Sequence, residues 1–222
     1  MTRVVLIRHG ESVAQVESFI AGHDACRGLS DRGRQQVEAL RDRLLVTGEL
    51  EADVFLTSLM QRAVETASIL APALGGAEAL QECGFCEIHP GEADGLTWDE
   101  RDARYRAEPG WEWTPETVLS PGGETWTEFV ARAGAALEEV VAEHAGKTIV
   151  IACHGGIVRA SMIHFIGLAI DAANATMVFN ASVTEWRFPA GPVDNGLEPA
   201  RRWRLHRFND HAHLAGTDLL PD

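Results

Sequence analysis

The sequence is short of positive charge. It has 222 residues, with 19 Lys and Arg against 33 Asp and Glu, and a formal net charge of −14 at pH 7. A nucleic-acid-binding domain normally has a net basic charge or a basic stripe, so we expect no nucleic-acid partner. The same shortage argues against a role at a membrane surface. An anionic ligand would need a locally positive pocket within this acidic chain.

Cysteine and long apolar runs are also scarce. The four cysteines are too few for a disulfide scaffold. The first apolar run, Val4–Ile7, has only four residues before Arg8, which is not the pattern of a signal peptide. The other apolar runs are as short as strands, so we expect no transmembrane helix. These absences lead us to expect a cytoplasmic location.

Internal repeats and linkers are missing as well, which excludes a solenoid or a coiled-coil array. Hydrophobic residues make up 45% of the chain, enough for a packed core. We therefore expect a single domain over residues 1–222. No clean periodicity appears between residues 81 and 123, an irregular stretch that contains four of the nine prolines, six of the 21 glycines and three of the six tryptophans.

Short apolar runs alternate with segments of helical periodicity. The expected strands are 4–7, 53–57 and 147–153, with two or three more near 176–180, 182–188 and 201–208. The expected helices are 31–46, 59–74, 97–108, 124–144 and 156–167. This alternation predicts an α/β fold with a mostly parallel central sheet. Because the strand sequences lack polar alternation, we expect helices on both faces, which makes three layers.

Polar residues stand where three of these strands end. They are Arg8-His9-Gly10, Thr57-Ser58 with Arg62 one helical turn later, and Cys153-His154-Gly155-Gly156. The carboxyl ends of parallel strands lie at one edge of a sheet, so these side chains should meet there. Helix N-termini and guanidinium groups both favour an anion. The sequence therefore predicts a pocket for a small phosphorylated substrate.

A neutral histidine beside such a pocket can attack phosphorus. The reaction then needs an acid for the leaving oxygen and a base for the incoming water. Carboxylates in the irregular stretch are the candidates. Glu87 is the first choice, and Glu82 and Glu92 are the alternatives.

At this point the motifs resemble a known family. Val4–Ser12 (VVLIRHGES) is similar to the R-H-G-E-[ST] signature of the histidine phosphatase superfamily, which includes cofactor-dependent phosphoglycerate mutases. Further similar motifs follow in the family's order and extend the resemblance over residues 3–214. They are Leu29–Gln36, Ser58–Ala67, Glu87–Thr97, Gly123–Thr125, Cys153–Gly156 and Asn209–Leu214.

The resemblance implies a role for each matching residue. His9 would be the phosphorylated nucleophile, Arg8, Arg62 and His154 would complete the phosphate pocket, and Glu87 would be the acid and base. The expected substrate-binding residues are Ser12, Gln15, Gly22 and Gly155. Residues 88–123 would form a specificity insertion, an irregular and partly helical excursion over the active site.

Two positions depart from the family pattern. Gln15 stands where most members have Asn, and Ala93-Asp94 stands where Trp-Glu is usual. The extra methylene of Gln15 and the different packing at residues 93–94 leave these two contacts open.

The leading interpretation is a metal-independent phosphatase that needs no cofactor. A phosphoglycerate mutase is the first alternative, but the family's mutases carry E-R-H-Y-G-x-L-x-G and a paired-Arg insert. This chain has Glu87-Ile88-His89-Pro90-Gly91 and no adjacent arginines before residue 201. A non-catalytic module that binds phosphorylated ligands is the second alternative. The physiological substrate and the assembly, including a homodimer, stay open.

Three other patterns have plainer explanations. Cys83-x-x-Cys86-x-x-His89 offers only three ligands and no second C-x-x-C, so we expect ordinary thiols and no metal. The cluster of Trp98, Trp111, Trp113 and Trp126 is interpreted as packing for the irregular stretch. Arg101, Arg104 and Arg106 alternate with acidic residues, which is typical of a solvated helix.

Overall fold

The computed structural model describes residues 1–76, 78–106, 112–189 and 203–220, in which six strands form one sheet. The strands are β1 (Thr2–Arg8), β2 (Val54–Thr57), β3 (Leu80–Gln81), β4 (Thr148–Cys153), β5 (Val183–Phe188) and β6 (Arg204–Asp210). Their order is β3-β2-β4-β1-β5-β6. The pairs β1–β4, β2–β4 and β2–β3 are parallel, whereas β5 runs antiparallel to both β1 and β6. The sheet is therefore mixed and mostly parallel.

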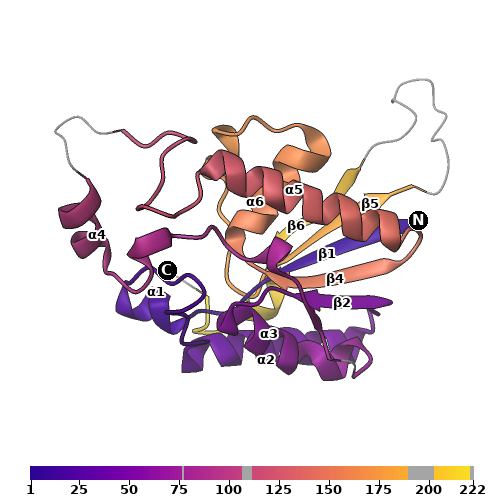
Figure 1. Cartoon of the computed structure of the whole chain (residues 1–222). Helices are drawn as coiled ribbons and strands as arrows, with labels where there is room; N and C mark the ends of the chain where they lie inside the picture. Colours follow the sequence, from indigo (N-terminus) through magenta and orange to yellow (C-terminus); the bar gives the residue numbers. More distant parts are fainter. Residues whose placement is uncertain (77, 107–111, 190–202, 221–222) are drawn as a thin grey trace.

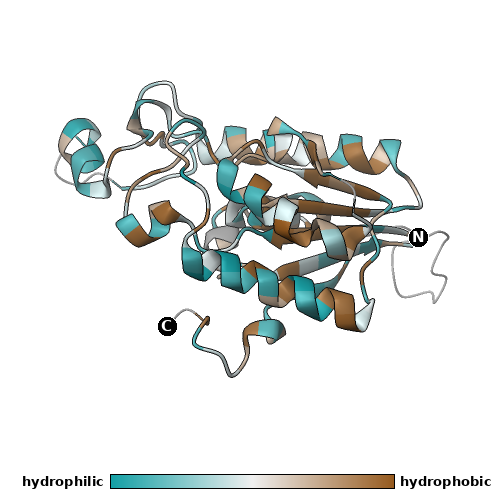
Figure 2. Cartoon of the chain, turned by 90° about the horizontal axis from the view of Figure 1, so that it is seen from below, coloured by the Kyte–Doolittle hydropathy of each residue, from teal (hydrophilic) through white to brown (hydrophobic). Residues whose placement is uncertain are grey.

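Helices cover both faces of this sheet (Figure 1). Helices α5 (Trp126–Glu143) and α6 (Gly155–Ile166) lie on one face, and α2 (Asp31–Thr47) and α3 (Gln61–Leu70) lie on the other. Along β1, Val4 and Leu6 belong to the core under α5 and α6, while Val5 and Ile7 belong to the core against α2. Figure 2 shows the apolar strands enclosed between helices whose outer sides are polar. The predicted three-layer α/β fold is confirmed.

The irregular stretch lies at the carboxyl ends of the parallel strands (Figure 1). It contains α4 (Trp98–Tyr105), close to the predicted helix, and the 3₁₀ turns Cys83–Phe85 and Gly91–Ala93. A one-turn helix, α1 (Val13–Glu17), follows β1 on the same side. The excursion therefore lies beside the strand ends that carry the candidate residues.

The elements differ from the prediction in three ways: one helix is shorter, one strand does not form, and two short elements were not predicted. The helix expected over 59–74 ends at Leu70 and continues as a 3₁₀ turn, Ala71–Leu74, because Pro72 has no N–H to donate. The strand expected near 176–180 does not form, and this segment is a loop after the 3₁₀ turn Ala172–Ala175. The short elements α1 and β3 were not predicted. A last 3₁₀ turn, Ala212–Leu214, follows β6.

Among the described residues, no helix combines the length and apolarity needed to cross a bilayer.

Candidate active site

The turn after β1 is held against two helices by closely packed backbone. A methyl group on Gly10 would lie 2.3 Å from the carbonyl oxygen of Gly33 in the first turn of α2, so only glycine fits here. The Gly10 N–H donates to Thr66 Oγ1 over 3.3 Å, and the next N–H along the chain donates to Gln36 Oε1 over 2.9 Å. These contacts fix the backbone that carries His9.

The imidazole of His9 has one nitrogen held by the backbone. Its Nδ1 lies 2.6 Å from the carbonyl oxygen of Gly10, and the residue is 5% exposed. Burial, followed by the charges of Arg62 and Arg8, lowers the His9 pKa well below 6.5. The ring is therefore neutral at pH 7, and Nδ1–H is the donor to the carbonyl. The lone pair is then on Nε2, the atom that could act as a nucleophile.

Two arginines surround His9 with permanent positive charge. Arg8 donates through Nη1 to the Val178 carbonyl, while its buried Nε has no hydrogen-bond partner among the described residues. Burial lowers the Arg8 pKa to about 10, which still leaves the group charged at pH 7. Arg62, 5% exposed, donates through Nη1 to the Ala21 carbonyl over 3.0 Å. A buried guanidinium with an unpaired donor is suited to an anion that supplies the missing acceptor.

His154 lies behind His9, with 5.2 Å between the ring centroids. Its Nδ1 accepts from Arg62 Nε over 3.3 Å, and its Nε2 lies 2.7 Å from Ser58 Oγ. Burial and the charge of Arg62 lower the His154 pKa well below 6.5, so the neutral ring donates through Nε2–H to Ser58. His154 thus orients the guanidinium of Arg62 from behind.

Glu87 faces the same cavity, and its carboxylate is held by backbone donors. Oε2 accepts from the Gly156 N–H over 3.0 Å, and Oε1 accepts from the Ile88 N–H over 3.2 Å. A methyl group on Gly156 would lie only 2.0 Å from Oε1, so the glycine leaves room for the carboxylate. Glu87 is the one described acidic residue on the cavity wall, which includes neither Glu82 nor Glu92.

Ser12 and Gln15 form a capping box at the start of α1, whose N-cap is Ser12. The Ser12 N–H donates to Gln15 Oε1 over 3.0 Å. Gln15 and Asn180 then pair through their amides, with both N···O distances 3.2 Å. Glutamine suits the third helical position of a capping box, which accounts for its presence where the family pattern has Asn.

Asn180 is a site residue that the sequence analysis missed. Its Nδ2 also donates to the His9 carbonyl over 3.1 Å, and it is 6% exposed. In the sequence it stands at the end of the strand expected near 176–180, within a glycosylation-like triplet, and no motif marks it. Ser58 was also missed as a site residue, although it begins one of the quoted motifs.

The two glycines expected to bind substrate lie outside the cavity wall formed by the described residues. The Gly22 N–H donates to Asp94 Oδ1 over 2.7 Å, and Asp94 Oδ2 accepts from the Asp24 N–H over 3.0 Å. Asp94 therefore ties the loop after α1 to the excursion. Gly155 begins α6 beside Arg8, at the helix end where an anion is favoured.

The cavity has a volume of about 490 Å³ and two chemically different parts. Its charged end is formed by Arg8, Arg62, His9 and Glu87. The rest of its wall is mostly apolar. The larger apolar residues there are Phe19, Ile20, Ile88, Pro90, Trp98 and Leu119. Among the described residues on the wall, Arg8 and Arg62 are the only cations.

The tryptophans do not all serve as packing. Trp126 stacks on Phe129 with 5.0 Å between centroids, as expected. Trp98 is 52% exposed and lines the cavity, so the packing interpretation is wrong for it. Trp113 is also exposed, and Trp111 lies outside the described residues.

The solvated-helix interpretation is wrong for one of the three arginines. Arg101 is 4% exposed, and its Nε donates to the Leu119 carbonyl over 2.8 Å, which joins α4 to the cavity rim.

Comparison with known proteins agrees with this geometry. The model of the histidine phosphatase superfamily (branch 1) matches residues 4–194. The Arabidopsis thaliana phosphoglycerate mutase-like protein 4 is 30% identical, over 98% of this chain and 89% of the relative. A metal-independent phosphoserine phosphatase of the same plant is 26% identical, over 99% of this chain and 86% of the relative. The solved structure of a mycobacterial glucosyl-3-phosphoglycerate phosphatase superposes with a TM-score of 0.74 at 27% identity, covering 93% of this chain and 98% of that one.

Proposed function

This chain belongs to the histidine phosphatase superfamily, and we propose that it is a metal-independent phosphatase that hydrolyses a small phosphate monoester through a phosphohistidine at His9. The proposal rests on the protonation and the hydrogen bonding of the His9 imidazole. A neutral imidazole, held through Nδ1 by the Gly10 carbonyl, leaves Nε2 free beside the cations Arg8 and Arg62.

In the first step, His9 Nε2 forms a bond to phosphorus, and the bond from phosphorus to the leaving oxygen breaks. Arg8 and Arg62 bind the phosphoryl oxygens and balance their charge. Glu87 gives its proton to the leaving oxygen, which departs as an alcohol. In the second step, a water attacks the phosphohistidine and Glu87 takes its proton, so that phosphate leaves and neutral His9 returns.

The apolar part of the cavity wall indicates the nature of the rest of the substrate. A phosphate bound at His9 uses both described cations of the wall, Arg8 and Arg62, so neither remains for a second anionic group. Phe19, Ile88 and Trp98 present apolar surface instead. We infer that the alcohol part is uncharged and largely apolar, because burying an unpaired carboxylate against such a wall is costly.

The same charge distribution argues against a mutase. A mutase must hold a bisphosphorylated intermediate, whose second phosphate needs further cations. The chain is similar to a phosphoglycerate mutase-like protein, but its described cavity wall supports hydrolysis of a monoester.

A pair of substrates of similar size tests both parts of the proposal. We expect kcat/KM for phenethyl phosphate to exceed that for phosphoserine by at least tenfold, and phosphate to be released from both. Trp98→Ala should lower kcat/KM for phenethyl phosphate and leave that for phosphoserine nearly unchanged. Preference for phosphoserine would contradict the substrate class. Interconversion of phosphoglycerates without net release of phosphate would contradict hydrolysis.

A further inference from the structure

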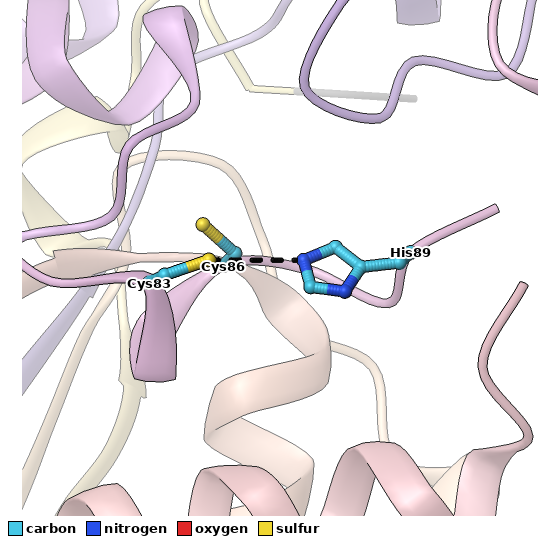
Figure 3. Close-up of side chains that lie close together, drawn as sticks. All are labelled: Cys83, Cys86 and His89. Carbon is cyan, nitrogen blue, oxygen red and sulfur yellow. Dashed lines mark hydrogen bonds between the residues drawn. The ribbon is translucent and has the colours of Figure 1, made fainter. Parts of the chain in front are cut away.

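Two thiols and an imidazole meet on the segment that leads into and past Glu87 (Figure 3). Cys83 begins a 3₁₀ turn, Cys86 follows that turn, and His89 comes three residues later. Their Sγ and ring-nitrogen atoms all lie within 4.8 Å of one another, and Cys83 Sγ lies 3.9 Å from His89 Nε2. Sulfur and imidazole nitrogen are the donors that Zn²⁺ prefers.

The imidazole is oriented from behind by a carboxylate. His89 Nδ1 lies 3.4 Å from Glu124 Oε2, on the opposite side of the ring from Nε2. Glu124 is itself fixed by Arg132, whose Nε donates to Oε1 over 2.7 Å and whose Nη2 donates to Oε2 over 2.8 Å. Metal-binding histidines usually make this second contact to a carboxylate, which fixes the ring and directs the other nitrogen toward the metal.

The backbone that carries the thiols is fixed as well. Arg132 Nη1 donates to the carbonyl groups of Cys83, Gly84 and Cys86 over 3.0, 3.1 and 3.3 Å. Burial raises the pKa of the Cys86 thiol to about 12, so a metal that binds there must displace a proton.

From this arrangement we propose that Cys83, Cys86 and His89 form a binding site for a thiophilic divalent cation of the Zn²⁺ class, with water as the fourth ligand. Tetrahedral Zn²⁺ places two sulfurs about 3.8 Å apart and a sulfur and a nitrogen about 3.5 Å apart. The three donor atoms are therefore within about an ångström of the required spacing. The ligand count in the sequence argued against a metal, and Glu124 and Arg132 supply the orientation that the sequence does not reveal.

This site is separate from the phosphate pocket. Among the described residues, the cavity wall includes Glu87 and Ile88 but none of Cys83, Cys86 and His89. The cation would therefore take no part in hydrolysis, and the proposal does not depend on the proposed function. It would close a loop of chain around the backbone of Glu87 and so stabilise that segment.

Spectroscopy with Co²⁺ in place of Zn²⁺ tests the site directly. The full chain is reduced with a phosphine, freed of metal with a chelator, and titrated with Co²⁺. We expect one equivalent to produce a sulfur-to-cobalt charge-transfer band and the intense visible bands of tetrahedral Co²⁺, and one equivalent of Zn²⁺ to remove both.

Variants assign the ligands. Cys83 is exposed, so Cys83→Ser should fold normally and lose the charge-transfer intensity of one thiolate together with at least 100-fold in Zn²⁺ affinity. Glu124→Gln should keep the bands but weaken Zn²⁺ affinity by about 10- to 100-fold. The control Cys26→Ser, outside the cluster, should bind one equivalent like the parent. Absence of thiolate bands in the parent, or equal Zn²⁺ affinity in the parent and Cys83→Ser, would overturn the proposal.

Discussion

The backbone N–H of Gly156 donates to Glu87 Oε2 over 3.0 Å, and a side-chain methyl at Gly156 would lie 2.0 Å from the other carboxylate oxygen. The second glycine of the Cys153–Gly156 motif therefore leaves room for the carboxylate and binds it. This relationship links the first turn of α6, just after β4, to the irregular stretch of residues 81–123, and the two residues are 69 positions apart in the chain.

The first prediction follows from that contact. Gly156→Ala should displace the Glu87 carboxylate and reproduce the loss in Glu87→Gln, because both variants remove the acid from the leaving oxygen. General acid catalysis contributes about 10²- to 10⁴-fold, so turnover of an alkyl phosphate should fall by at least 100-fold. Formation of phosphohistidine from p-nitrophenyl phosphate should fall much less, because p-nitrophenolate leaves with little protonation.

Single-turnover rates with both substrates provide the measurement, and Glu92→Gln serves as the control that should match the parent. Equal losses for the two substrates in Glu87→Gln would show that Glu87 is not the acid. Parent-like rates in Gly156→Ala would show that the carboxylate does not need its position beside α6.

The second prediction concerns Asn180. Asn180→Ala should remove one of the two donors to the His9 carbonyl, which keeps the Ala181 N–H, and should also remove the amide pairing with Gln15. A typical hydrogen bond contributes about 0.5–1.5 kcal/mol net, so urea denaturation should show a loss of stability of about that size. The rate of His9 phosphorylation should fall by about tenfold or more, because proper placement of the reacting atoms is lost. A variant as active and as stable as the parent would show that Asn180 does not position His9.

The third prediction is that hydrolysis needs no metal. Arg8 and Arg62 supply the charge that a metal supplies in other phosphatases. After exhaustive dialysis against a chelator, kcat should stay within twofold of its starting value, even though any Zn²⁺ at the Cys83 cluster is removed. Cys83→Ser should behave in the same way. If activity were lost and one divalent ion restored it, Arg8 and Arg62 would not be the source of the positive charge that the reaction needs.

The fourth prediction concerns stability and pH. The pKa values of His9 and His154 lie well below 6.5 in the folded chain and return to about 6.5 on unfolding. Below pH 6.5 the unfolded chain therefore binds more protons, and the free energy of unfolding should decrease as the pH falls from 7 to 5. Each histidine contributes a slope of up to about 1.4 kcal/mol per pH unit. His154→Gln should reduce the slope by that amount in urea denaturation at several pH values. An unchanged slope in His154→Gln would contradict the lowered pKa.

The sequence predicted the elements whose ends have local chemical markers. The helix expected over 31–46 forms as Asp31–Thr47, because Ser30 caps its start and Gly48 adopts the left-handed conformation at its end. Arg8, His9 and Arg62 lie on one cavity wall as predicted, because β1 and β2 are both parallel to β4 and end at the same edge of the sheet, and α3 carries Arg62 shortly after β2.

The residues that were missed depend on contacts between distant parts of the chain. Asn180 reaches His9 only because β5 runs antiparallel beside β1, and no local sequence pattern predicts that pairing. Arg101 looks like a surface charge in the sequence, and it becomes buried because the Leu119 segment folds over α4. Trp98 lines the cavity and is not part of the core, because α4 lies beyond the carboxyl ends of the parallel strands.

The central claim is that His9 carries the phosphoryl group during turnover. The parent and His9→Ala are mixed with ³²P-labelled substrate, quenched within one turnover, and assayed for protein-bound label. We expect close to one equivalent of label on the parent, stable in base and lost in acid. His9→Ala should take up no label while it retains the parent's thermal stability to within a few degrees, and its turnover should fall by several powers of ten. A parent without acid-labile label, or a His9→Ala variant with turnover within tenfold of the parent, would contradict the account.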